Sequence, residues 1–111
     1  MADQSEEMAN LSIRSEQEAG TLTIRLAGEL DAQTAERFTA AIEEAERSHA
    51  VIILVDLTEV QFIDSTGLVT LLMASRRSDR EGRGLQVRAG SGEVRHLLEL
   101  TAIDERLNLI D

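Results

Sequence analysis

The residues best suited to chemistry lie in one short segment of the chain, Asp64-Ser65-Thr66-Gly67, which combines a carboxylate with two hydroxyl groups. A serine in such a setting can attack a substrate, accept a group from another protein, or cap a helix. As a nucleophile it would need a histidine to take its proton and an acid to orient that histidine.

The chain has 2 histidines, and each can be considered as a base for Ser65. His49 follows the first expected helix and precedes the most apolar run. We therefore expect it at the edge of the sheet opposite the Ser65 loop. His96 falls inside the last expected helix, and its position relative to Ser65 stays open at this stage. The Gly-x-Ser-x-Gly elbow of many serine hydrolases is absent around Ser65.

Other catalytic and ligand-binding patterns are also missing from the sequence. Two residues separate Asp64 from Gly67, so the Asp-Thr/Ser-Gly tripeptide of aspartic proteases is not formed. There is no His-Glu-x-x-His pattern and no calcium-binding loop. We therefore predict that the protein is not an enzyme and that it binds no metal and no cofactor itself.

Composition narrows the class of protein further. The net charge of -10 and an aromatic content of 2% argue against direct binding of nucleic acid, which needs a basic surface and stacking platforms. The lack of cysteine excludes disulfides and thiol chemistry. The acidic start is unlike a signal peptide, and no apolar run reaches the roughly 18 residues of a membrane-spanning helix. These features predict a cytoplasmic protein without membrane insertion.

Periodicity predicts one domain around the Asp-Ser-Thr-Gly segment. Residues 1–10 are acidic and aperiodic, so we expect a disordered acidic tail followed by a single domain over residues 11–111. Apolar and polar residues alternate on both sides of a turn at 18–20, which predicts an antiparallel hairpin. A helix follows the hairpin, with Asp31 as its expected N-cap.

The second half of the pattern predicts parallel strands. The run 51–55 is apolar at every position, which is typical of a strand covered on both faces. We expect a loop over 56–63 and then a mostly buried helix over 65–79, with Val69 and Met73 widening its apolar face. One more strand, one more helix and a short final strand complete the order. The predicted fold class is α/β, with a mixed sheet of four or five strands and packed helices.

Helix capping alone can account for the polar cluster. Asp64, Ser65 and Thr66 all favour a helix N-terminus, and the charge of Asp64 suits the positive end of the helix dipole. From the residues alone, a capped helix after a buried strand is the simpler interpretation, and a functional serine is the alternative.

Three segments of the chain resemble the STAS domain family, in particular the bacterial anti-sigma factor antagonists. The segments are Gly28-Glu-Leu-Asp31, the run 51–57 together with Phe62-Ile-Asp-Ser-Thr-Gly-Leu68, and Leu97-Leu-Glu-Leu-Thr-Ala-Ile-Asp104. The similarity covers residues 11–111, nearly the whole chain. It implies an α/β STAS fold and a protein-binding switch.

The resemblance implies a specific role for Ser65. In the family, the serine directly after the aspartate accepts a phosphate from an anti-sigma factor that is a GHKL-type serine kinase, and the complex then separates. A serine phosphatase removes the phosphate, and ATP and metal belong to these partners. The expected partner-binding residues are Asp31, Asp64, Ser65, Thr66, Gly67 and Leu68. The protein is then expected to be a monomer or a weak dimer.

Two functions are compatible with this resemblance. The first is an anti-sigma factor antagonist that sequesters the anti-sigma factor while Ser65 is unphosphorylated, which frees a sigma factor for transcription. The second is a STAS subunit of a transporter-linked ATPase or of a stressosome-like signalling complex, in which Ser65 is never phosphorylated.

Overall fold

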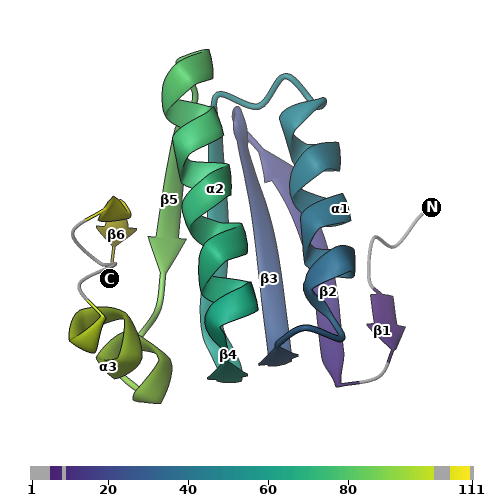
Figure 1. The fold of residues 1–111 in the computed structure, drawn as a ribbon. Coiled ribbons are helices and arrows are strands. Elements are labelled where there is room, and N and C mark those ends of the chain that lie inside the picture. The colour runs from purple at the N-terminus through teal and green to yellow at the C-terminus, as the bar shows by residue number, and fades with distance from the viewer. Residues whose placement is uncertain (1–5, 9, 102–105, 111) are drawn as a thin grey trace.

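A computed structural model describes residues 6–8, 10–101 and 106–110, which form one sheet of six strands and three helices (Figure 1). The strands, in spatial order, are β1 (Glu6–Met8), β2 (Leu11–Glu18), β3 (Thr21–Leu30), β4 (Ile52–Ile63), β5 (Gly84–Arg88) and β6 (Leu109–Ile110). The helices are α1 (Ala35–Glu46), α2 (Ser65–Glu81) and α3 (Glu93–Leu100). The pairs β1–β2 and β2–β3 are antiparallel, and the remaining three pairs are parallel.

The core lies between the sheet and the helices, with α1 and α2 side by side across the sheet (Figure 1). Alternate residues of β2, β3, β4 and β5 point into it, as the side-chain period of two requires. On β4 these are Ile53, Val55 and Leu57, each with 0% of its surface exposed. Because the chain has few aromatic residues, aliphatic side chains fill almost all of this core around the single buried ring of Phe38.

The α/β fold class is confirmed, but the sheet is larger than expected. It has six strands within the described residues, where the sequence predicts four or five. Part of the difference is β1, which lies within the segment expected to be a disordered tail. Residues 1–5 and 9 of that segment lie outside the described residues.

The prediction of a loop over 56–63 is wrong, because β4 continues to Ile63. This half of the strand pairs with β3 through two register irregularities, which are typical of β-bulges. The Oδ1 atom of Asp56 accepts hydrogen bonds from the backbone N of Thr58 (3.0 Å) and from its Oγ1 (2.7 Å). Polar residues on the exposed side give this half the composition of a loop, although its backbone is extended.

An ionic row crosses the sheet on the face opposite Ile53, Val55 and Leu57. Arg25, Asp56 and Arg88 are neighbours in register on β3, β4 and β5. A guanidinium nitrogen of Arg25 lies 3.0 Å from Asp56, and one of Arg88 lies 3.7 Å from it. Arg25 also bonds Glu16 at 2.9 Å, and this hydrogen bond is the main reason why the pKa of Arg25 is raised. The buried carboxylate of Asp56 therefore has compensating partners.

Candidate functional site

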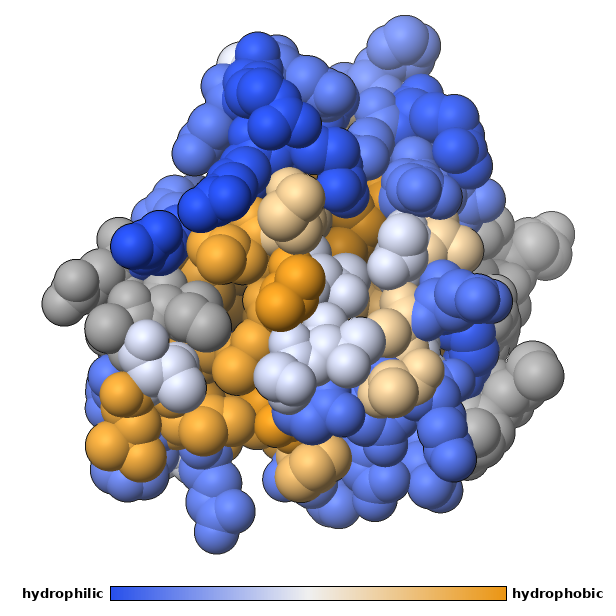
Figure 2. All heavy atoms as spheres, viewed as in Figure 1, coloured by the Kyte–Doolittle hydropathy of each residue, from blue (hydrophilic) through white to orange (hydrophobic). Residues whose placement is uncertain are grey.

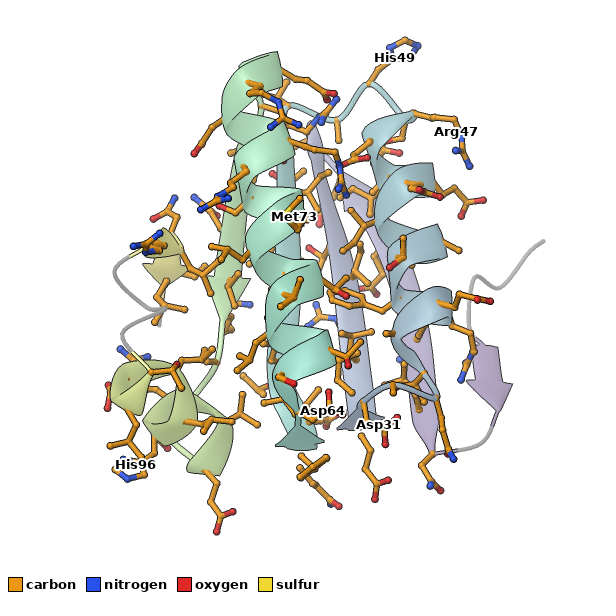
Figure 3. The ribbon with its side chains drawn as sticks, in the orientation of Figure 1. Asp31, Arg47, His49, Asp64, Met73 and His96 are labelled. Atoms are coloured by element: carbon orange, nitrogen blue, oxygen red, sulfur yellow. The ribbon has the colours of Figure 1, made fainter. Side chains whose placement is uncertain are left out.

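The candidate site forms where β3 and β4 end side by side. The last residues of the two strands, Leu30 and Ile63, are paired in register, and the backbone N of Asp64 donates to the carbonyl of Leu30 at 3.1 Å. Asp31 and Asp64 are the residues that follow. Figure 3 shows both at this edge of the sheet, near the start of α2.

Asp64 caps α2, and the two hydroxyl residues follow it on the surface. Asp64 has an extended backbone, and its Oδ1 accepts a hydrogen bond from the backbone N of Gly67 at 3.1 Å. Ser65 and Thr66 are the first two residues of the helix, and both are exposed. Among the described residues, none forms a hydrogen bond with the hydroxyl of Ser65. The capping task is therefore carried by Asp64, and the Ser65 hydroxyl is available to another molecule.

Gly67 and Leu68 are buried, unlike the three residues before them. A β-carbon built on Gly67 would lie 2.8 Å from Cγ1 of Ile63 and 2.9 Å from both Cγ and the carbonyl oxygen of Leu30. The first turn of α2 thus rests directly on the ends of β3 and β4. Both residues can fix the position of Ser65, but neither presents much surface to a partner.

Asp31 is placed at the site, although its expected role as N-cap of the first helix is wrong. Helix α1 begins at Ala35 and its N-cap residue is Thr34. The carboxylate of Asp31 instead accepts hydrogen bonds from the backbone N of Gln33 (3.0 Å) and of Thr34 (3.2 Å). The hydroxyl of Thr34 in turn accepts a hydrogen bond from the backbone N of Asp31 at 3.0 Å and donates one to the carbonyl of Glu29 at 2.9 Å. This turn holds Asp31 at the edge of the sheet beside Asp64.

The histidines lie away from Ser65. His49 is at the opposite edge of the sheet, as expected, and His96 is exposed on α3 (Figure 3). Among the residues that the structure describes, no cluster of His, Asp and Glu is suited to hold a metal ion. In the same part of the chain, no helix has the length and apolar content needed to cross a bilayer.

An apolar stripe runs along α2 from Ser65, and the sequence interpretation missed it. Val69 and Met73 follow Ser65 at intervals of four residues, so all three lie on one side of the helix. They were expected to widen the buried face, but they are 56% and 44% exposed. Figure 2 shows hydrophobic side chains gathered on this side of the molecule, and Figure 3 labels Met73 on the outer side of α2. The spacing of four residues between Ser65, Val69 and Met73 is the sequence signal that could have identified this stripe.

Comparisons with known proteins agree with this fold and identify the family of the chain. The family model described as Mlab, STAS domain matches residues 13–111, so the chain belongs to the STAS domain family. The chain is 30% identical over 101 residues to the anti-sigma-B factor antagonist of Listeria monocytogenes, a match that covers 90% of this chain and 89% of the relative. It is also 30% identical over 103 residues to the anti-sigma F factor antagonist of Paenibacillus polymyxa, with 92% and 88% covered.

A solved structure of another anti-sigma factor antagonist has the same fold as this chain. The crystal structure of an anti-sigma factor antagonist from Mycobacterium paratuberculosis superposes with a TM-score of 0.82 at 26% identity. The superposition covers 89% of this chain and 84% of that protein. The similar proteins named here are thus anti-sigma factor antagonists, and they match this chain over nearly its whole length.

Proposed function

We propose that the protein is an anti-sigma factor antagonist whose binding to an anti-sigma factor is switched by phosphorylation of Ser65. The observation that carries the proposal is the division of roles at the start of α2. Asp64 caps the helix, and the exposed hydroxyl of Ser65 is left without a hydrogen-bond partner among the described residues. Relatives that are themselves anti-sigma factor antagonists, and that match over nearly nine-tenths of their own length, support the same function.

The fold can accept a phosphate at Ser65 without rearrangement. The first N–H groups of a helix have no partner within the helix, and they favour a bound anion. Asp64 already occupies one of them, the N–H of Gly67. A phosphate would add a charge of about -1.5 to -2 at neutral pH. It would therefore change the charge of the surface while the backbone stays in place.

The docking surface in this proposal is formed by the exposed residues around Ser65. Asp31, Asp64 and Thr66 contact the partner, while Gly67 and Leu68 act by holding the helix start in position. The stripe of Val69 and Met73 extends this surface along α2. A partner that covers Ser65 in the unphosphorylated state would have to bury a dianion in the phosphorylated state. A difference of a few kcal/mol between the two affinities is enough for a switch.

The partners in this proposal are a GHKL-type serine kinase, which is the anti-sigma factor, and a serine phosphatase, all in the cytoplasm. A STAS subunit of a transporter-linked ATPase or of a stressosome-like complex has less support, because the two relatives named above, each 30% identical over about nine-tenths of this chain, are antagonists.

Intact-mass measurement tests the proposal. The protein is incubated with ATP and each candidate serine kinase from the same genome, and one kinase is expected to add the mass of a single phosphate. The gain is expected to disappear in Ser65→Ala and to persist in Ser91→Ala. Ser91 is a matched control because it is exposed close to the start of α3. The proposal is contradicted if Ser65→Ala still gains the phosphate, or if no kinase adds a phosphate to the wild type.

A further inference from the structure

An apolar groove lies beside the Ser65 site, between the end of β4 and α3. Strand β5 pairs with β4 only from Ile52 to Asp56, so the second half of β4 is free of that neighbour and α3 packs against it instead. The groove between them measures about 360 Å³. Its apolar lining comes from five side chains, Phe62, Ile63, Val94, Leu97 and Leu100.

The two outer walls of this groove are unusually exposed for their residue types. Phe62 is 51% exposed and Leu100 is 69% exposed, whereas Ile63 and Val94 at the bottom are buried. The described residues include five large hydrophobic side chains that are exposed: Val51, Phe62, Val69, Met73 and Leu100. All except Val51 belong to the groove or to the α2 stripe. Exposed apolar surface gathered in this way marks an interaction site rather than a random scatter.

The groove is continuous with the site around Ser65. Phe62 and Ile63 directly precede Asp64, so one wall of the groove leads into the N-cap of α2. Figure 2, seen from the same side as Figure 1, shows hydrophobic side chains over α3 at the lower left of the molecule. A protein that covers Ser65 therefore lies within reach of the groove.

Charge identifies the kind of partner. Asp31 and Asp64 stand at this edge of the sheet, and Glu93 lines the groove. None of the three forms an ion pair with another described residue. Arg95, by contrast, is engaged with Glu99 at 3.3 Å and with the carbonyl of Gly90. His96 also lines the groove, but the three unpaired carboxylates outnumber it, so the surface around the groove is acidic overall and complements a basic surface.

Two other occupants fit less well. A second copy of this chain would bring the same carboxylates together, and the net charge of each copy is -10. A free small molecule is usually enclosed by its pocket over most of its surface, whereas the outer walls of this groove are more than half exposed.

We propose that the groove between β4 and α3 receives an apolar side chain that projects from a basic surface of the same protein that covers Ser65. The groove is then a second anchor point of that interface, and its contribution does not depend on the charge at Ser65. This inference rests on the proposed function, because the protein that covers Ser65 is the anti-sigma factor of that proposal.

Binding measurements with substituted groove walls test the inference. The unphosphorylated protein is titrated with each purified GHKL-type serine kinase from the same genome, and the Kd is measured for the wild type and for Phe62→Ser/Leu100→Ser. We expect the double substitution to raise the Kd by roughly tenfold or more. Val51→Ser is the matched control, because Val51 is also exposed, at 67%, and directly precedes β4, whereas the groove lies at the other end of that strand. It is expected to change the Kd by less than about twofold.

Folding and self-association are checked in the same experiment. Circular dichroism shows whether the double variant is folded, and Leu100→Ser alone replaces it if it is not. An unchanged Kd in the groove variants, together with weaker binding of Ser65→Asp, overturns the inference that the groove binds the partner and leaves the proposed function intact. If no kinase binds the wild type, the proposed function fails and the groove inference fails with it. A dimer in sedimentation velocity that the groove variants dissociate, with kinase affinity unchanged, assigns the groove to a second copy and also overturns the inference.

Discussion

A β-carbon on Gly67 would lie 2.9 Å from the carbonyl oxygen of Leu30, so the first turn of α2 and the end of β3 approach each other as closely as a glycine permits. The same carbonyl accepts the backbone N–H of Asp64 at 3.1 Å. Leu30 thus holds both the cap and the first turn of α2, and through them the position of Ser65.

Gly67→Ala is expected to destabilise the fold by roughly 1–3 kcal/mol, because the added methyl group must displace backbone as well as side chains. Urea denaturation measures the change. Gly92→Ala is the control, since a β-carbon there meets nothing within 4 Å. It should change the free energy of unfolding by less than about 1 kcal/mol. Equal effects of the two substitutions would contradict the close approach.

Ser65→Asp is expected to weaken binding of the anti-sigma factor by roughly tenfold or more, because it places a permanent charge on the docking surface. The fold should be unaffected within about 0.5 kcal/mol, since an acid is favourable in the first turn of a helix. Titration calorimetry gives the first quantity and thermal denaturation gives the second. Gln17→Glu also adds one negative charge, but near the end of β2 at the opposite edge of the sheet, and it should bind normally. An unchanged affinity in Ser65→Asp argues against the switch.

Val69→Ser combined with Met73→Ser should reduce affinity for the same partner by roughly tenfold with little loss of stability, because the two residues are already 56% and 44% exposed in the free protein. Surface plasmon resonance measures the affinity. The neighbouring residue Leu71 is fully buried, and Leu71→Ser should instead unfold the domain. Wild-type affinity in the double variant would remove the α2 stripe from the docking surface.

Asp56→Ala is expected to destabilise the protein by roughly 1–3 kcal/mol, because the bulge at Thr58 and two arginines lose a buried acceptor. Asp56→Asn should be milder, since its amide oxygen can still accept from the backbone N of Thr58. Arg25→Ala should have a smaller effect, under about 1 kcal/mol, because 47% of that side chain is exposed. Urea denaturation gives the free energy of unfolding of the three variants. A larger loss in Arg25→Ala than in Asp56→Ala would contradict the central role of the Asp56 carboxylate in this row.

The sequence predicts the order of strands and helices well because the apolar period is clear in β2, β3 and α1. It fails at β4 because the second half of that strand presents Thr58, Glu59 and Gln61 to solvent, and only the pairing with β3 shows that it is extended. The same limit applies to the row of Arg25, Asp56 and Arg88. These residues are far apart in sequence, and register alone brings them together.

At the candidate site, the sequence identifies the cluster of residues but not the division of work within it. Three consecutive capping residues are indistinguishable by type, and the backbone decides that Asp64 is the cap. Asp31 was expected to cap α1, yet Thr34 takes that position because an extra turn precedes the helix. The exposed stripe on α2 was hidden because apolar residues on several sides of a helix suggest burial on all of them.

The contact between Leu30 and Gly67 also limits how the serine loop could be transplanted. Copying the five residues 64–68 into another strand–loop–helix unit would supply the hydroxyl and its cap but not the neighbouring strand end on which the helix rests. The smallest portable unit is therefore the pair of parallel strand ends with the helix start between them. A designer who wants a phosphate-responsive surface would have to move that whole corner of the sheet.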